Sequence, residues 1–192
     1  MEPIRCFIAI ELPQPIKSAL SQLQDSLKKS EHPSVKWAAP EGIHLTLKFL
    51  GNVVSEKLPA LTKAITGAVR GTTPFQLNLG SPGVFPNTKA PRVVWIGIEG
   101  EVEPLLTLHN NIEHALSTLG FPLEERAFSP HLTLGRVRES ASPVERRRLG
   151  EVIASLKVES KVFFKVDSLS LMRSKLTQEG ALYSSLASFP LG

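Results

Sequence analysis

The chain has 192 residues, of which 42% are hydrophobic and 21% charged, and its formal net charge is +4. This composition is average for a folded soluble domain, and the small positive charge favours a polyanionic partner only weakly. The single cysteine, Cys6, excludes an internal disulfide and suits a reducing compartment. No apolar run approaches the roughly 20 residues that span a bilayer, and the N-terminal apolar run is too short for a signal peptide. We therefore expect a cytoplasmic protein with no membrane association.

The first half of the chain predicts alternating strands and helices. Residues 43–51 alternate polar and apolar side chains, as a half-buried strand does. Residues 80–91 are rich in Pro and Gly and predict the loop that connects the two halves. In chain order, the expected elements are a buried strand at 3–11, an amphipathic helix at 15–29, a short strand at 35–37, the strand at 43–51, a helix capped by Ser55 that runs to about 69, and a strand at 75–79.

The second half repeats these elements at a nearly constant offset. Residues 91–99 match residues 3–11 position by position, 88 residues later, and Ser142 lies 87 residues beyond Ser55. The expected elements are a strand at 91–99, a helix at 103–119, a strand at 129–136, a helix capped by Ser142 with Pro143 at its first position, and strands at 161–173 and 182–189. We interpret this pattern as an internal duplication of βαβ-type halves, about 1–85 and 86–192, within one bilobal domain over residues 1–192.

The two half-buried strands carry the same motif. His44-Leu45-Thr46-Leu47 recurs as His131-Leu132-Thr133-Leu134, 87 residues later. Side chains two apart on a strand share a face, so each copy presents one imidazole and one hydroxyl on one side and two leucines to the core. An approximate two-fold axis would bring the equivalent strands face to face, and would place both histidines and both threonines in one site.

Paired histidines with hydroxyl donors suit acid–base catalysis on a phosphodiester. The unperturbed histidine pKa of about 6.5 allows one ring to be neutral and the other protonated near neutral pH. One ring then activates water while the other protonates the leaving oxygen. The hydroxyls of Thr46 and Thr133 would hydrogen-bond the non-bridging phosphate oxygens. Such a site requires no metal.

Other kinds of site fit the sequence less well. A lone His-x-Thr on a strand is more often structural, but two copies at a matched offset favour function. A metal site is the main rival because imidazole is a common ligand, yet neither motif has Asp, Glu or Cys at ligand spacing. His109 and His114 lie five residues apart on a predicted helix, and we expect both on its surface. No Gly-x-Ser-x-Gly elbow or Gly-rich phosphate loop is present.

The paired motifs resemble those of the two-histidine phosphoesterases, and their context resembles the RNA 2′,3′-cyclic phosphodiesterase branch, also called 2′-5′ RNA ligases. That context comprises Arg5-Cys6-Phe7-Ile8-Ala9-Ile10, His44 to Gly51, Pro91-Arg92-Val93-Val94-Trp95, Ser129 to Arg136, and Leu169-Ser170-Leu171-Met172 through Gly180-Ala181-Leu182-Tyr183.

The resemblance implies a bilobal α+β fold with antiparallel sheets lining a central groove. It implies hydrolysis of 2′,3′-cyclic phosphate at RNA ends to 2′-phosphomonoesters, with His44 as proton donor and His131 as proton acceptor. The reverse reaction would join RNA ends without ATP. We expect no cofactor or metal, no obligate protein partner and a monomer. Two alternatives stay open: a phosphodiesterase for small cyclic nucleotides or ADP-ribose cyclic phosphate, and a non-catalytic RNA- or nucleotide-binding module.

Three further residues are candidates for substrate binding. The family places an arginine near the phosphate or terminal nucleotide at the position of Arg136. Strict alternation turns Arg136 away from His131, although Gly135 offers a point where the chain can bend. Lys48 shares the His44 face by alternation and is either a phosphate contact or a solvated rim lysine. Phe7 either stacks a base in the groove or packs in the core.

Overall fold

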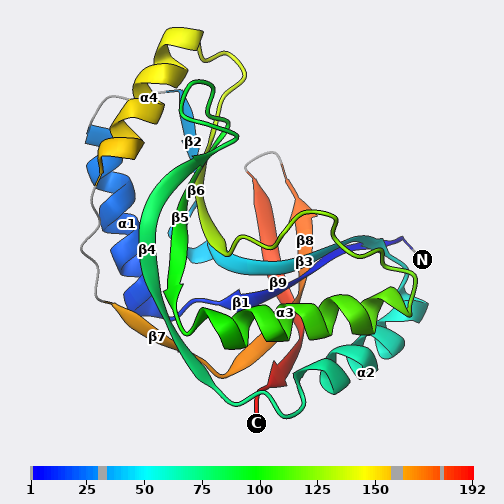
Figure 1. Ribbon diagram of the computed structural model, residues 1–192. Helices are drawn as coiled ribbons and strands as arrows, with labels where there is room; N and C mark the ends of the chain where they lie inside the picture. Colours follow the sequence, from blue (N-terminus) through cyan, green and yellow to red (C-terminus); the bar gives the residue numbers. More distant parts are fainter. Residues whose placement is uncertain (1, 30–33, 157–161, 178–179) are drawn as a thin grey trace.

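The computed structural model of the chain describes residues 2–29, 34–156, 162–177 and 180–192, and has the expected α+β architecture (Figure 1). Its strands are β1 (Ile4–Glu11), β2 (Val35–Trp37), β3 (His44–Val53), β4 (Phe75–Phe85), β5 (Val93–Gly100), β6 (His131–Val137), β7 (Phe163–Val166), β8 (Ser168–Leu176) and β9 (Ala181–Pro190). Its helices are α1 (Gln14–Lys29), α2 (Leu58–Val69), α3 (Val102–Ser117) and α4 (Pro143–Ser155), with short 3-10 turns at Pro40–Gly42 and Ser55–Lys57.

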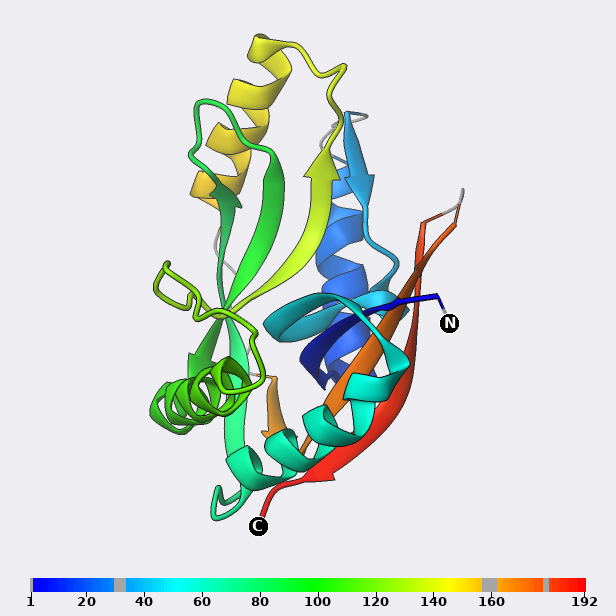
Figure 2. The same ribbon diagram turned by 90° about the vertical axis from the view of Figure 1, so that its right-hand side faces the viewer.

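The strands form two antiparallel sheets, which confirms the expected fold class. The first sheet has the order β3-β1-β8-β9 and the second the order β2-β6-β5-β4-β7. Figure 2 shows β4, β5 and β6 of the second sheet on one side of the molecule and β8 and β9 of the first sheet on the other. The histidine strands have corresponding partners, since β3 pairs with β1 and β6 pairs with β5, but β3 is the edge strand of its sheet whereas β6 also pairs with β2.

The two halves of the sequence exchange strands between the sheets. β4 comes from the first half but pairs with β5, and β8 comes from the second half but pairs with β1. β4 also pairs with β7, and in that pairing Leu77 lies opposite Phe164. These two residues are 87 apart, which is the offset between the histidine motifs. A residue that pairs with its equivalent in the other repeat lies at the approximate two-fold axis. Because β4 and β8 are exchanged, each sheet contains strands from both halves of the sequence.

The core is built from the inward faces of both sheets and the apolar faces of the helices. Residues 6–10 of β1 are all buried, as a strand covered on both faces requires. Burial raises the pKa of the Cys6 thiol, partly opposed by the charge of Arg173. Helix α1 packs on the second sheet, where the buried Gln24 amide donates hydrogen bonds to the carbonyls of Ala38 and Leu134. Among the described helices, none has the length and apolarity that crossing a membrane requires.

Some expected element boundaries were wrong. Ser55 starts a 3-10 turn and its side chain caps no helix, and α2 begins at Leu58. β4 continues through the predicted loop to Phe85, because its backbone goes on pairing with β5 after a register shift between Leu79 and Pro82. The strand expected at 161–173 is two strands, β7 and β8, and residue 161 lies outside the described residues. The Ser142 cap is confirmed, with a reciprocal capping box to Glu145.

Candidate active site

His44 and His131 stand at the first residues of β3 and β6 and are held in the same way. His44 Nδ1 lies 2.8 Å from the Gly42 carbonyl oxygen, and His131 Nδ1 lies 2.7 Å from the Ser129 carbonyl oxygen. A carbonyl only accepts, so Nδ1 donates in both rings, and Nε2 is the atom left to exchange protons. Cα atoms of β3 and β6 approach within 8 Å of each other. The two imidazoles are thus held in the same way, and the strands that carry them are neighbours although they belong to different sheets.

Aromatic side chains surround both rings. His44 stacks on Phe7 with ring centroids 4.6 Å apart and meets the edge of Tyr183 at 4.9 Å. His131 lies at 5.0 Å from Phe85 and 6.1 Å from Trp95, both in edge-on geometry. Packing on two sides restricts each ring, in addition to the hydrogen bond at Nδ1.

Burial lowers the pKa of His44 from its ordinary value. The hydrogen bond to Gly42 and the charge of Glu11, which pairs with His44 across β1 and β3, act in the opposite direction but are smaller. In the free protein the neutral ring is therefore favoured at His44. A bound phosphate anion would shift this balance towards the imidazolium.

Thr46 and Thr133 follow the histidines on the same faces, as the alternation predicted. Both are half-buried, and they pair with Ala9 and Trp95 respectively. Within the part of the chain that the structure describes, neither hydroxyl has a hydrogen-bond partner. Both hydroxyls are consequently free to donate to a ligand between the strands.

Equivalent bulges follow the two threonines. The β1–β3 pairing skips Leu47, and the β5–β6 pairing skips Leu134. A bulge adds one residue and so reverses the alternation beyond it. In β6 this turns Gly135 inward and leaves Arg136 exposed on the histidine face. The bend considered for Arg136 is therefore present, although it starts at Leu134.

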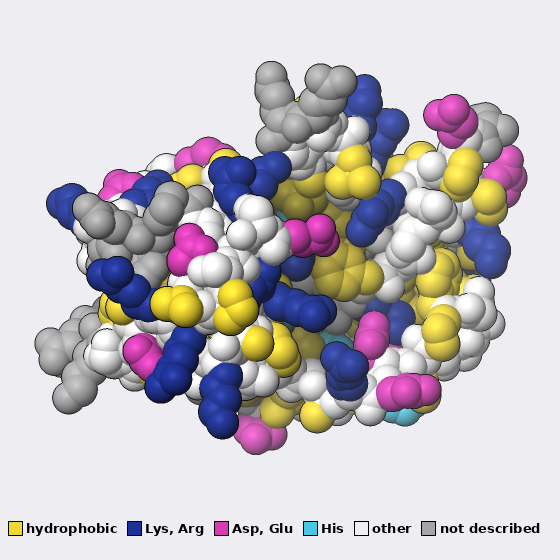
Figure 3. All heavy atoms as spheres, turned by 90° about the horizontal axis from the view of Figure 1, so that it is seen from above, with side chains coloured by type: hydrophobic (Ala, Val, Ile, Leu, Met, Phe, Trp, Pro, Cys, Tyr) yellow, Lys and Arg dark blue, Asp and Glu magenta, His cyan; other side chains and the backbone are white. Residues whose placement is uncertain are grey.

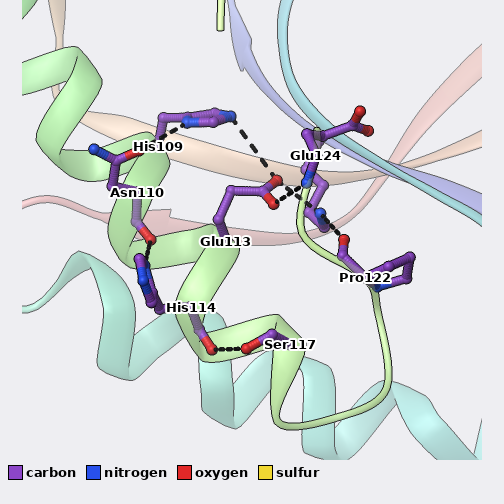
Figure 4. A network of polar contacts seen from close by, with 8 residues as sticks. His109, Asn110, Glu113, His114, Ser117, Pro122 and Glu124 are labelled. Atoms are coloured by element: carbon purple, nitrogen blue, oxygen red, sulfur yellow. Dashed lines mark hydrogen bonds and ion pairs between the residues drawn. The ribbon is translucent and has the colours of Figure 1, made fainter. Parts of the chain in front are cut away.

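The same reversal contradicts the expectation for Lys48. Its side chain is buried, Nζ lies 2.7 Å from Glu113 Oε1 on α3, and it donates to the Pro122 carbonyl at 2.8 Å. Glu113 Oε2 also accepts from the backbone N–H of Glu124 at 2.9 Å, so Glu113 is the centre of the network in Figure 4. The charge of Lys48 is neutralised inside the protein, on the side of β3 away from His44.

His109 belongs to this network and is not on the surface as expected. It is buried and stacks on Phe128, with ring centroids 4.0 Å apart. Its Nε2 lies 3.8 Å from Glu113 Oε1 (Figure 4). His114 is exposed, as predicted, with Nδ1 bonded to the Asn110 carbonyl. Within the described ranges, no group of three or more His, Cys, Asp or Glu side chains is placed to share a metal ion.

Of the two roles considered for Phe7, the structure supports packing in the core and not contact with a base. Phe7 is 2% exposed because it lies beneath His44, so its ring has no free face. Phe49 was not predicted to lie on the histidine face, but the bulge at Leu47 turns it there, and it is 62% exposed. The repeat could have predicted this position, because Phe49 lies 87 residues before Arg136, the offset between the two motifs. Figure 3 shows a hollow in which hydrophobic side chains lie deep, Lys and Arg stand around them and parts of His side chains are visible.

The duplication of the chain is also found when its sequence is compared with known protein families. The family described as LigT like phosphoesterase matches the chain twice, over residues 10–95 and 96–183. The chain belongs to this family. The resemblance to the two-histidine phosphoesterases and the internal duplication are thereby confirmed, while the division at about 85/86 stays a prediction.

Relatives within the LigT-like phosphoesterases extend over nearly the whole chain. The RNA 2′,3′-cyclic phosphodiesterase of Methanothermobacter thermautotrophicus is 36% identical over 188 residues, covering 98% of this chain and 99% of the relative. That of Methanocaldococcus jannaschii is 33% identical and covers 94% of this chain and 96% of the relative. Among crystal structures, TT0787 of Thermus thermophilus matches with a TM-score of 0.81 at 28% identity, covering 98% of both chains. E. coli LigT complexed with 3′-AMP matches with a TM-score of 0.78 at 27% identity, covering 99% of both.

Proposed function

We propose that this protein hydrolyses 2′,3′-cyclic phosphates at RNA ends to 2′-phosphomonoesters, without a metal or cofactor. The observation that carries the proposal is the matched pair of imidazoles, each held at Nδ1 by the carbonyl two residues before it. Membership of the LigT-like phosphoesterases supports it, as does the activity named for relatives that match nearly the whole chain. The complex of E. coli LigT with 3′-AMP supports a nucleotide as ligand of the same fold.

In the proposed reaction His131 Nε2 takes a proton from a water molecule, whose oxygen attacks the phosphorus. The bond from phosphorus to O3′ breaks, and protonated His44 gives its Nε2 proton to O3′. The product carries a 2′-phosphate and a 3′-hydroxyl, His131 is protonated and His44 is neutral, and exchange with solvent restores the pair. Thr46 and Thr133 donate to the non-bridging oxygens, and Arg136 provides positive charge beside them. The reverse reaction joins 2′,3′-cyclic phosphate and 5′-hydroxyl ends. The protein acts as a monomer in the cytoplasm, with no obligate partner.

The decisive experiment is turnover of an oligonucleotide ending in a 2′,3′-cyclic phosphate, with EDTA present, followed by phosphorus NMR of the product. We expect complete conversion to a 2′-phosphomonoester at an undiminished rate. Binding without turnover would instead support a nucleotide-binding module. A faster reaction with a nucleoside 2′,3′-cyclic phosphate or ADP-ribose cyclic phosphate than with the oligonucleotide would favour a small-molecule phosphodiesterase.

A further inference from the structure

A row of cations continues the histidine face of the second sheet beyond the Leu134 bulge. Arg136 of β6 lies directly opposite Lys36 of β2 in the antiparallel pairing. Directly opposite residues of such a pair point to the same face of the sheet, so Lys36 shares the histidine face with Arg136. β2 is the edge strand of this sheet and lies beside β6 (Figure 1). The cations therefore extend from the second motif to the edge of the sheet.

The packing on the other face of β2 agrees with this direction of Lys36. Val35 and Trp37, the neighbours of Lys36 in the chain, point to the opposite face, where they belong to the core or pack against it. A Cβ added at Gly135 would stand 2.8 Å from Val35 Cγ1 and 3.1 Å from Trp37 Cε3. Because the core side of β2 is closely packed, the exposed Lys36 side chain extends from the face that carries the site.

Arg138 adds a third cation to the row. Its backbone N–H donates to the Ser34 carbonyl at 2.7 Å, so the pairing of β2 with β6 continues past Val137. Arg138 lies two residues beyond Arg136 and therefore points to the same face. Residues diagonally across such a pair are about 7–8 Å apart, within reach of long side chains. Lys36 and Arg138 are thus close enough to contact one anionic ligand.

The side chains of Lys36, Arg136 and Arg138 have no acidic partner. All three are exposed, and none of them forms an ion pair or a hydrogen bond within the described residues. Arg147, by contrast, is an exposed arginine that pairs with Glu151 at 3.0 Å. Like charges directly opposite each other on a sheet are destabilising. The uncompensated row therefore indicates a surface on which an anion is bound.

The proposed reaction accounts for only one phosphate. The cyclic phosphate lies between the histidines and the threonines, and it is the single anionic group of a nucleoside 2′,3′-cyclic phosphate. An RNA strand carries a further phosphodiester on the 5′ side of its terminal nucleotide, and one more for each nucleotide before it. Lysine and arginine are the usual partners of such backbone phosphates. The cations beyond Thr133 therefore fit a substrate longer than one nucleotide.

We propose that Lys36 and Arg138 form a second phosphate subsite, which binds phosphodiesters on the 5′ side of the terminal nucleotide of an RNA strand. The strand then leaves the site along β6 towards β2. The inference rests on the proposed function and deepens it, since it makes the substrate an RNA strand instead of a mononucleotide. Contacts to phosphate carry no base information, so this subsite selects for chain length and not for sequence.

The test measures binding, so that it does not depend on turnover. The probes are a nucleoside 2′-phosphate and two tetranucleotides of different sequence that end in a 2′-phosphate, each titrated by calorimetry at several salt concentrations. Lys36→Gln should raise Kd for both tetranucleotides by about 3-fold to 10-fold. The slope of log Kd against log salt should fall by about 0.7, the value for one lost contact to a single strand. Binding of the nucleoside 2′-phosphate should not change, and Lys36→Arg should restore the affinity for the tetranucleotides.

Arg138→Gln should weaken the same two probes and again leave the nucleoside 2′-phosphate unchanged. Neither glutamine variant should have a lower Tm, because each substitution removes a repulsion between like charges. Lys63→Gln is the matched control, since Lys63 on α2 is exposed, has no partner within the described part of the chain and lies outside the row. It removes the same charge and should leave all three probes unchanged.

Three results would overturn the inference. An equal loss with Lys63→Gln would assign the effect to net charge, and an equal loss for the nucleoside 2′-phosphate would place Lys36 at the terminal phosphate. Unchanged binding of the tetranucleotides by the Lys36 and Arg138 variants would exclude the subsite. Failure of the proposed function appears separately, as absence of turnover of cyclic phosphate ends by a protein whose tetranucleotide binding depends on Lys36.

Discussion

Lys48 Nζ lies 2.7 Å from Glu113 Oε1 and joins the strand that carries His44 to helix α3. Both side chains are buried, and Lys48 also holds the Pro122 carbonyl, in the segment that leads from α3 towards Ser129 and His131. Simple alternation would place the Lys48 ammonium on the face of His44. In the structure it instead connects the first histidine strand to the segment that precedes the second one. The buried pair therefore connects β3 both to α3 and to the segment that leads to the second motif.

Removing one partner of the pair leaves an unpaired buried charge. We expect Lys48→Met to lower the free energy of unfolding by roughly 3–5 kcal/mol in urea denaturation. The double variant Lys48→Met with Glu113→Gln should recover most of this loss, because the amide still accepts from Glu124 N–H and no charge is left. Lys28→Met is the control, since the Lys28–Asp25 pair is largely exposed and should contribute at most about 1 kcal/mol. Equal losses for Lys28 and Lys48 would refute a special role for the buried pair.

Substitution of either motif histidine should abolish most of the activity without unfolding the protein. His44→Ala and His131→Ala each remove one proton-transfer group, so we expect kcat to fall by about 10² to 10⁴ in the oligonucleotide assay. His114→Ala changes an exposed histidine on α3 and should retain full rate. A near-normal kcat in a folded His44 or His131 variant would remove that residue from the chemistry.

The lowered pKa of His44 predicts how activity and stability depend on pH. If His44 must be protonated to act as the acid, kcat/KM of the free enzyme should fall with rising pH around a midpoint below 6.5. NMR of the ring resonances should show the same midpoint in the free protein. A midpoint at or above 6.5 would contradict the dominance of burial over the Gly42 hydrogen bond and the Glu11 charge.

The lowered pKa of His44 also determines the direction in which the free energy of unfolding changes with pH. A histidine whose pKa is lower in the folded state binds protons more readily when unfolded. The contribution of His44 to the free energy of unfolding is fully present above the pKa of the ring in the unfolded chain, about 6.5. This contribution is lost as the pH falls through the lower pKa of the ring in the folded protein. The free energy of unfolding should decline over this acidic window, and His44→Asn should reduce the decline. A slope that is the same in both proteins would contradict the assignment.

Gly83 is required by the indole of Trp95, which lies beside His131. A Cβ at position 83 would stand 2.3 Å from Trp95 Cζ2, so Gly83→Ala must displace the ring. Because the indole helps to restrict His131, we expect kcat/KM to fall by about 10-fold to 100-fold. Gly67→Ala in α2 is the control: an added Cβ meets no atom within 4 Å, and the helix should gain up to about 1 kcal/mol. A Gly83→Ala enzyme with normal activity would show that His131 does not need the indole in this position.

The histidines and threonines of the site could be predicted because they precede the bulges, where simple alternation holds. Lys48, Phe49 and Arg136 follow the bulges, and alternation assigns each of them to the wrong face. The sequence around Leu47 and Leu134 does not indicate a bulge at either residue, because a bulge depends on the pairing with the neighbouring strand. Once Arg136 is placed on the histidine face, however, the repeat offset places Phe49 there as well.

The exchange of β4 and β8 between the sheets could not be read from the sequence for a different reason. A duplicated pattern shows which elements are equivalent, but not whether an equivalent strand joins its own sheet or the other one. The length of β4 was also hidden, because Pro82 and Gly83 are typical of loops, whereas here they lie in a strand that pairs with β5. Gly83 is accounted for by the indole that covers it, which belongs to a residue twelve positions further along the chain.

The pairing of Leu77 with Phe164 has a consequence for how such a protein could arise. A polypeptide with only one repeat would expose an unfilled edge beside its first strand, and only the matching strand of a second molecule would fill it. Its simplest stable form is a strand-swapped homodimer with one histidine from each subunit at the shared cleft. When both repeats lie in one chain, equivalent positions can carry different residues, as Phe49 and Arg136 do.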